Sequence, residues 1–197
     1  EAAARFRLGT DSLDGVSVAV QGVGNVGRHL CRLLHEAGAV LMVADVNREN
    51  LKLTSDELPV TVVRPAEILF ADVDVLAPCA LGNVLTSLTI PKIKAKIVAG
   101  GANNQLSTEA DGARLADRDI LYAPDYVINA GGIINVAHEY YGGSSEDSVR
   151  NEIARIPERL DKIFNESKTS KRPTNVIADE VARRIVAAAG DDAPAAA

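Results

Sequence analysis

Residues 19–30 of the chain read AVQGVGNVGRHL, with three glycines in the spacing G-x-G-x-x-G. The β-branched run at residues 16–20 that precedes them is typical of a buried strand. Behind them, apolar residues recur at helical spacing from Leu30 to Ala37, and Gly38 is expected to end this helix. A strand, a glycine turn and a helix in this order predict the first unit of a parallel α/β sheet.

The three glycines are spaced as in loops that bind a dinucleotide. Gly22 can make the sharp turn out of the strand, Gly24 lets a pyrophosphate approach the backbone, and Gly27 lets the helix pack closely against the strand. Asn25 and Val26 stand where the start of the helix presents free N–H groups and a positive dipole end to phosphates. An ordinary tight turn is the alternative, because the motif alone is a weak signal.

The second apolar run ends in an acidic residue at the position that a dinucleotide site requires. Residues 39–45, AVLMVAD, predict a second buried strand, and Asp45 lies about 20 residues beyond the glycines. Its carboxylate can accept hydrogen bonds from the adenosine ribose and would repel a 2′-phosphate, so we expect NAD rather than NADP. Val46 is a further candidate cofactor residue, whereas Arg48 could admit the 2′-phosphate of NADP.

Further apolar runs extend the same pattern along the chain. Strands are expected at residues 60–63, 73–77, 96–99 and 120–123, with helical stretches such as residues 107–115 between most of them. Short apolar strands that alternate with helices are typical of a parallel sheet covered on both faces. We therefore expect a doubly wound α/β domain, a mostly parallel Rossmann-type sheet with helices on both faces, followed by C-terminal helices.

Three loops after the later strands carry small residues and side-chain amides. They contain PCALGN at residues 78–83, GGANNQL at 100–106 and PDYVINAGG at 124–132. Ligands bind beyond the carboxyl ends of the strands in an open parallel sheet, so these loops should face the cofactor. The amides of Asn104 and Asn129 can bond to a neutral carboxamide such as that of nicotinamide, although either amide could instead cap its own turn.

The pattern changes at the segment GGSSED, which is expected to be a linker or a helix cap. An apolar stripe then predicts one long helix that Pro157 should kink, and residues 176–186 predict a final helix. The stripe consists of Val149, Ile153, Ile156, Leu160, Ile163 and Phe164. Because burial favours such a stripe, we expect it to fold back on the sheet, with pairing to a second copy or mobile helices as the alternatives. The expected organisation is a dinucleotide-binding domain at residues 1–143, a helical extension at 144–189 and a disordered tail at 190–197.

Charge and cysteine content argue against several classes of protein. A net charge of −6 without a basic cluster argues against binding of nucleic acid or an anionic membrane. No stretch approaches the roughly 18 apolar residues of a membrane helix. Cys31 and Cys79 lie in apolar contexts outside any C-x-x-C motif, which predicts a reducing, cytoplasmic setting and no metal site.

Four motifs in this order resemble the cofactor-binding domain of the amino acid dehydrogenases that act on glutamate, leucine, phenylalanine and valine. They are AVQGVGNVGRHLCRLLHEAGA, APCALG, AGGANNQL and YAPDYVINAGGIINVA, and the resemblance extends over residues 9–186. It is stronger for the leucine, phenylalanine and valine branch. It implies reversible, NAD-linked oxidative deamination of an apolar L-amino acid to the 2-oxo acid and ammonia by a homo-oligomer. It also implies that one strand of the sheet is antiparallel.

The resemblance implies roles for individual residues. Ala80 would lie beside the nicotinamide ribose, and Asn104 would also lie near the substrate. Ile133 and Val136, three residues apart on one helical face, would line the pocket for the substrate side chain, with plain core packing as the alternative. Their apolar character makes glutamate a poor substrate. The implied cofactor residues are Gly22, Gly24, Asn25, Val26, Gly27, Asp45, Val46, Cys79, Ala80, Leu81, Asn104 and Asn129.

The proton chemistry of this family has no counterpart in the chain. The family uses two lysines and an aspartate on a separate N-terminal domain, and no lysine lies in the site loops described above. His29, His35 and His138 are expected on helix surfaces. No catalytic residue is therefore assigned within this sequence.

The start of the chain predicts a fragment. It reads EAAARFRL, inside a helical pattern that Gly9 should end and without an initial methionine. We expect a missing N-terminal catalytic domain and no activity from the chain alone. The alternative is a non-catalytic NAD(H) sensor or assembly module, which has no reason to keep the nicotinamide-side loops.

Overall fold

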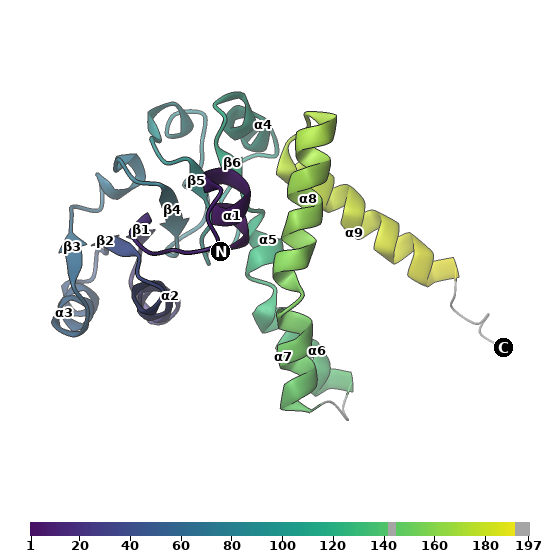
Figure 1. The fold of residues 1–197 in the computed structure, drawn as a ribbon, viewed down its shortest axis with the longest axis horizontal. Helices are drawn as coiled ribbons and strands as arrows, with labels where there is room; N and C mark the ends of the chain where they lie inside the picture. Colours follow the sequence, from purple (N-terminus) through teal and green to yellow (C-terminus); the bar gives the residue numbers. More distant parts are fainter. Residues whose placement is uncertain (142–144, 192–197) are drawn as a thin grey trace.

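The computed structural model describes residues 1–141 and 145–191. Its centre is one sheet of six strands in the order β3-β2-β1-β4-β5-β6 (Figure 1). Every observed strand overlaps one of the predicted ranges, because runs of valine, isoleucine and leucine mark strands that are buried on both faces. The strands are β1 (Ser17–Gln21), β2 (Val40–Ala44), β3 (Val60–Val62), β4 (Val75–Pro78), β5 (Ile97–Val98) and β6 (Leu121–Tyr122).

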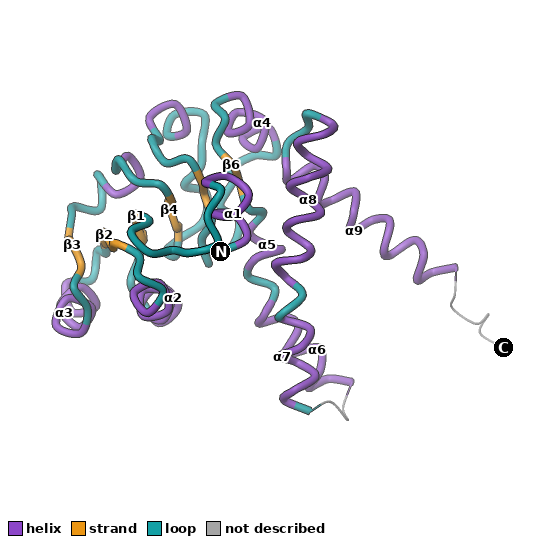
Figure 2. Tube along the Cα trace, in the orientation of Figure 1, coloured by secondary structure: helices purple, strands orange, loops and turns teal. Residues whose placement is uncertain are grey.

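All neighbouring strands in this sheet run parallel, so the expectation of one antiparallel strand is wrong. Each connection carries the chain from the carboxyl end of one strand back to the amino end of the next, because neighbouring parallel strands start at the same end of the sheet. Figure 2 shows these connections as helices and loops between the short strands. They contain α2 (Asn25–Glu36), α3 (Arg48–Glu57), η1 (Ile68–Phe70), η2 (Ile90–Lys92) and α4 (Ala110–Asp117).

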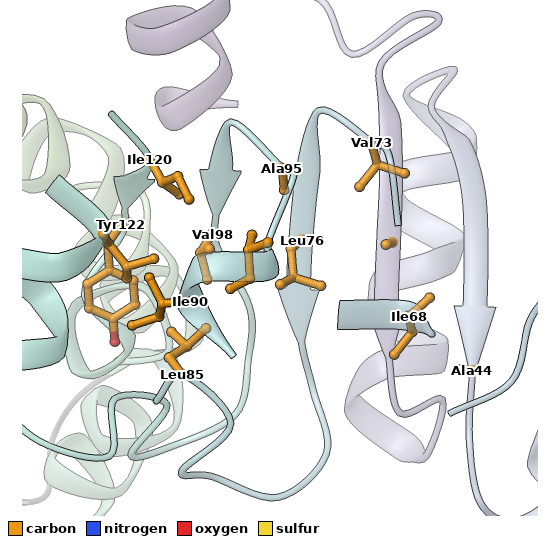
Figure 3. Packing of buried hydrophobic residues seen from close by; sticks show 13 residues of the cluster. Ala44, Ile68, Val73, Leu76, Leu85, Ile90, Ala95, Val98, Ile120 and Tyr122 are labelled. Atoms are coloured by element: carbon orange, nitrogen blue, oxygen red, sulfur yellow. The ribbon is translucent and has the colours of Figure 1, made fainter. Parts of the chain in front are cut away.

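The two faces of the sheet are covered by different elements. Val18 and Val20 of β1 pack against α2 and α3, whereas Ala19 between them points to the other face. That other face is covered by η1, η2 and α4. Its core includes Leu76 and Val98 from the strands, which Figure 3 draws beside side chains of the connections. The predicted doubly wound α/β architecture is therefore present.

The direction of winding reverses between β1 and β4. The chain moves outward from β1 through β2 to β3, then crosses back to β4 and moves outward again to β6. In open α/β sheets, the crevice beyond the carboxyl ends of the two central strands is the usual ligand site. Here the loops that follow β1 and β4 stand at this reversal.

The segment after the sheet forms several helices. They are α5 (Asp125–Ile128), α6 (Gly131–Tyr141), α7 (Glu146–Ile153), α8 (Ile156–Ser170) and α9 (Thr174–Asp191). The prediction of one long helix kinked at Pro157 is wrong, because α7 ends at Ile153 and a separate helix, α8, begins at Ile156. Pro157 instead occupies the first turn of α8, where its missing N–H has no intrahelical partner to lose. Ser145 caps α7 by accepting a hydrogen bond from Ser148 N at 3.2 Å.

The apolar stripe folds back on the sheet, as predicted, over the length of α8. Ile156, Leu160, Ile163 and Phe164 are buried together with Ile97 of β5 and with helix α1 (Ala2–Leu8). The rings of Phe6 and Phe164 pack with centroids 5.3 Å apart. Burial of each large side chain is worth roughly 1.5–3 kcal/mol, so this cluster holds the helices onto the sheet.

The burial of the stripe does not continue into α7, where Val149 is half-buried and Ile153 is exposed. Helix α9 runs away from the sheet toward the C-terminus (Figure 1), and its Ile185 and Val186 are exposed. It extends to Asp191, beyond the start of the predicted tail at residue 190. The rest of that predicted tail, residues 192–197, lies outside the described residues, as do residues 142–144 of the predicted linker.

Candidate functional site

The glycine turn after β1 is too tight for side chains at two of its three glycines. Gly22 adopts φ +89°, and a Cβ there would lie 2.7 Å from the Cβ of Ala80. A Cβ on Gly27 would overlap the carbonyl oxygen of Gly22 and lie 3.3 Å from the Cβ of Cys79. The sharp turn and the close helix packing expected from the sequence are therefore both present.

The third glycine leaves open space in front of helix α2. Gly24 is the N-cap of α2, and a Cβ there would meet no atom within 4 Å. The helix ladder begins with the bond from Arg28 N to Gly24 O, at 2.9 Å. Within the described chain no side chain caps this end, so the N–H groups of Asn25 and Val26 remain available to an anion.

Asp45 ties the glycine turn to the end of β2. Its Oδ2 accepts a hydrogen bond from Val23 N at 2.8 Å, and its Oδ1 accepts one from Asn47 N at 2.8 Å. Sequence reasoning assigned this carboxylate to the cofactor alone and missed its contacts with the backbone. Asn50 Nδ2 also donates to Oδ2, at 3.5 Å. A carboxylate has about four acceptor positions, so one remains for a further donor.

A hollow of about 650 Å³ lies beyond the ends of β2 and β3. Its walls include Asp45, Val46 and Arg48 from the second loop, and Arg64 and Glu67 from the third. Arg64 pairs with Glu67, and this guanidinium holds the pKa of the Glu67 carboxyl below its usual value. The hollow therefore presents both signs of charge, with Arg48 as a cation that no described carboxylate pairs.

The loops after β4 and β5 pack against the glycine turn and the start of α2. Cys79 Sγ accepts a hydrogen bond from Gly101 N at 3.4 Å, and a Cβ on Gly101 would lie 2.9 Å from Val26 Cγ1. Burial raises the pKa of the Cys79 thiol, so the thiol stays neutral here. Ala80 and Leu81, next along the chain, are exposed at this edge.

Asparagines join the three loops on this side. Asn83 N donates to Asn104 O at 2.6 Å, and Asn104 itself adopts φ +52°. Asn129 Nδ2 donates to the Oδ1 of Asn103, which sequence reasoning had not singled out. The structure thus brings the loops of Asn104 and Asn129 to one edge of the sheet, joined through Asn103. No local pattern could have found this bond, because its partners are 26 residues apart.

Ile133 and Val136 lie on one face of α6 and are exposed by 67% and 55%. Their core-packing alternative is therefore wrong. His29 and His35 are exposed on α2 as expected, whereas His138 is half-buried on α6. In the described part of the chain, no group of three or more His, Cys, Asp or Glu residues could hold a metal ion. None of the helices in residues 1–141 and 145–191 is long and apolar enough to cross a membrane.

The parallel sheet, its reversal of winding and the glycine turn at that point define a Rossmann-type α/β domain. Comparison with known proteins makes the assignment more specific. The chain belongs to the Glutamate/Leucine/Phenylalanine/Valine dehydrogenase family, whose model matches residues 43–190. The resemblance stated from the motifs is therefore confirmed.

Individual relatives agree with this family assignment. The chain is 47% identical over 182 residues to leucine dehydrogenase of Geobacillus stearothermophilus, covering 92% of this chain and 49% of the relative. It is 46% identical over 186 residues to L-tryptophan dehydrogenase of Nostoc punctiforme, covering 94% and 51%. The crystal structure of the Nostoc punctiforme enzyme superposes with a TM-score of 0.89 over 93% of this chain and 55% of that chain, at 46% identity. The chain thus spans about half the length of the curated relatives it matches.

Proposed function

We propose that the chain is the NAD-binding domain of an amino acid dehydrogenase that reversibly deaminates an apolar L-amino acid to a 2-oxo acid and ammonia. The observation that carries this proposal is the uncapped start of α2 behind Gly24, at the switch point of the sheet and beside Asp45. Space in front of a positive helix end suits a pyrophosphate, which has no side chain to displace there.

Residues of the first two loops would hold the adenosine half of the cofactor. The N–H groups of Asn25 and Val26 would donate to the phosphates, and the open face of Gly24 would let them approach. The remaining acceptor position of Asp45 would accept from a ribose hydroxyl, while the hollow beyond β2 and β3, which Val46 borders, would take the adenine. A 2′-phosphate would meet the charge of Asp45, which favours NAD over NADP despite Arg48.

Residues of the later loops would hold the nicotinamide half. Asn104 and Asn129 carry amides that match a neutral carboxamide, and Cys79, Ala80 and Leu81 leave room for a flat ring and its ribose. Bound NAD supplies the hydride acceptor. The protein residues orient that ring and shield it from water.

The side chain of the substrate would contact Ile133 and Val136. Both are apolar and exposed toward solvent in this chain, so a leucine-like or aromatic side chain could cover them and gain apolar burial. A glutamate side chain would leave its second carboxylate without a partner there. The relatives named for leucine and tryptophan are consistent with this preference.

The proton chemistry would come from a separate N-terminal catalytic domain. Residues 1–143 would form the dinucleotide domain, and residues 144–189 a helical extension that contacts the catalytic domain or another subunit of a homo-oligomer. Relatives about twice as long as this chain support the existence of such a domain.

Calorimetric titration of the chain with NAD, NADP and ADP-ribose tests the proposal. We expect NAD and ADP-ribose to bind and NADP to bind more weakly. A folded chain that binds none of the three at millimolar concentration would refute the cofactor role, and with it the enzyme class.

A further inference from the structure

A buried carboxylate, that of Asp125, lies beside the loops that carry Asn104 and Asn129, and no role has been given to it above. Asp125 begins α5 directly after β6 and is only 6% exposed. No lysine, arginine or histidine in the described chain pairs with it. A buried charge of this kind persists only where hydrogen bonds hold it in place, so its partners indicate its purpose.

Those partners come from two different segments. Asp125 Oδ2 accepts a hydrogen bond from Gln105 N at 3.1 Å, and its Oδ1 accepts one from the Tyr122 hydroxyl at 3.2 Å. Gln105 and Tyr122 are themselves buried. Burial, together with the nearby carboxylate, raises the pKa of Tyr122, so the phenol remains a donor.

The residue that Asp125 holds also shapes the loop after β5. Gln105 Nε2 donates to Gly100 O at 2.7 Å and to Ala102 O at 2.9 Å, so its side chain folds this loop upon itself. Asn103 and Asn104 lie between those two carbonyls and Gln105. Fixing Gln105 therefore fixes the position of both amides relative to β6.

The same aspartate also anchors the second amide segment. Asn129 N donates to the backbone oxygen of Asp125 at 2.9 Å, across the single turn of α5. Asn129 then reaches back to Asn103 through its side chain. Both the loop that contains Asn103 and the segment that contains Asn129 are therefore hydrogen-bonded to Asp125. The carboxylate thus holds the loop of Gln105 directly, whereas Asn129 is attached through the backbone of α5.

We propose that Asp125 is a positioning residue for the nicotinamide half of the site. Its carboxylate holds the loop of residues 100–106 against α5, so that the amides that face the nicotinamide are ordered before the cofactor arrives. This inference rests on the proposed function. A residue with this role affects the nicotinamide end of a dinucleotide and leaves the adenosine end unchanged, whereas a purely structural residue affects both.

ADP-ribose, which lacks the nicotinamide, separates the two possibilities. Asp125→Asn places a donor where one acceptor was, and Tyr122→Phe removes one donor to the carboxylate. Asp74→Asn is the control, because Asp74 accepts bonds from Ser17 N, Ser17 Oγ and Lys96 Nζ at the other end of the strands, away from the site loops. For each variant, the affinities for NAD and ADP-ribose are measured by calorimetry, and exchange of the Gln105 amide is followed by NMR.

We expect Asp125→Asn to weaken NAD by about three- to tenfold relative to ADP-ribose, to change ADP-ribose by less than about twofold, and to speed exchange at Gln105. Tyr122→Phe should also lower the affinity for NAD relative to ADP-ribose, but less than Asp125→Asn does. Asp74→Asn should leave this ratio of affinities unchanged. Equal weakening of both ligands, or no change in the ratio for either site variant, would overturn the positioning role. If the wild-type chain bound neither ligand, the proposed function itself would fail first.

Discussion

Replacing Gly27 by alanine should push helix α2 away from the glycine turn. The added Cβ would lie 2.9 Å from the carbonyl carbon of Gly22 and closer still to its oxygen, and real Cβ atoms do not come within 3.0 Å of such atoms. Overpacking of this kind costs about 1–3 kcal/mol, and the helix propensity of alanine returns up to about 1 kcal/mol. Since the clash is with backbone, we expect a net loss of about 1–2 kcal/mol and a Tm lower by about 2–8 °C.

Gly24→Ala is the matched control at the same helix end. Its Cβ would meet no atom within 4 Å, and the residue already has φ −65°. Stability should change by less than about 0.5 kcal/mol, while the new methyl group occupies the space in front of α2 and weakens ADP-ribose by about tenfold. Because the chain has no tryptophan, urea unfolding is followed by circular dichroism, and binding by calorimetry. The reasoning is refuted if Gly27→Ala is as stable as Gly24→Ala.

Three further outcomes are expected. Asp45→Ala should reduce the preference for NAD over NADP by about tenfold or more, and an unchanged ratio in calorimetry would show that the carboxylate does not set it. Phe164→Ala should lower the free energy of unfolding by about 3–5 kcal/mol, because the ring is fully buried against Phe6. A loss below about 1 kcal/mol in urea titration would show that the packing of α8 does not stabilise the fold. Burial raises the pKa of Cys31 from 9.0 to about 12, so its neutral thiol stabilises the fold fully below pH 9 and this stabilisation is lost as the pH rises toward 12. In Cys31→Ala, the free energy of unfolding should fall less steeply between pH 9 and pH 12. An equally steep fall in the variant would show that the Cys31 thiol does not cause it.

Much of the sheet could be predicted from the sequence because its strands are buried on both faces. Runs such as VSVAV at residues 16–20 carry this signal within a few residues, and the glycine turn marks the first connection. The antiparallel strand was an expectation from resemblance alone, and the observed pairing contradicts it. The break before Pro157 was misjudged because proline both kinks a helix and favours its first turn, and periodicity does not distinguish the two.

The candidate site was only partly predictable, because its ordering contacts join distant segments. Gly22, Gly27 and Asp45 belong to a spacing that the sequence displays directly. The bond between Asn103 and Asn129, and the carboxylate of Asp125 under Gln105, depend on how neighbouring strands bring their loops together. These bonds span 20 or more residues, so no local pattern of polar residues distinguishes them from ordinary turn caps.

The most direct test of the central claim is a map of where NAD binds on the isolated chain. At 20.8 kDa, the chain is small enough for amide chemical-shift titration by NMR. We predict the largest shifts at Gly24, Asn25 and Val26, with further shifts around Asp45 and Asn104. Shifts confined to the hollow at the amino ends of the central strands, which Val16, Asp74 and Lys96 line, or no shifts at millimolar NAD, would contradict the assignment of the α2 end as the cofactor site.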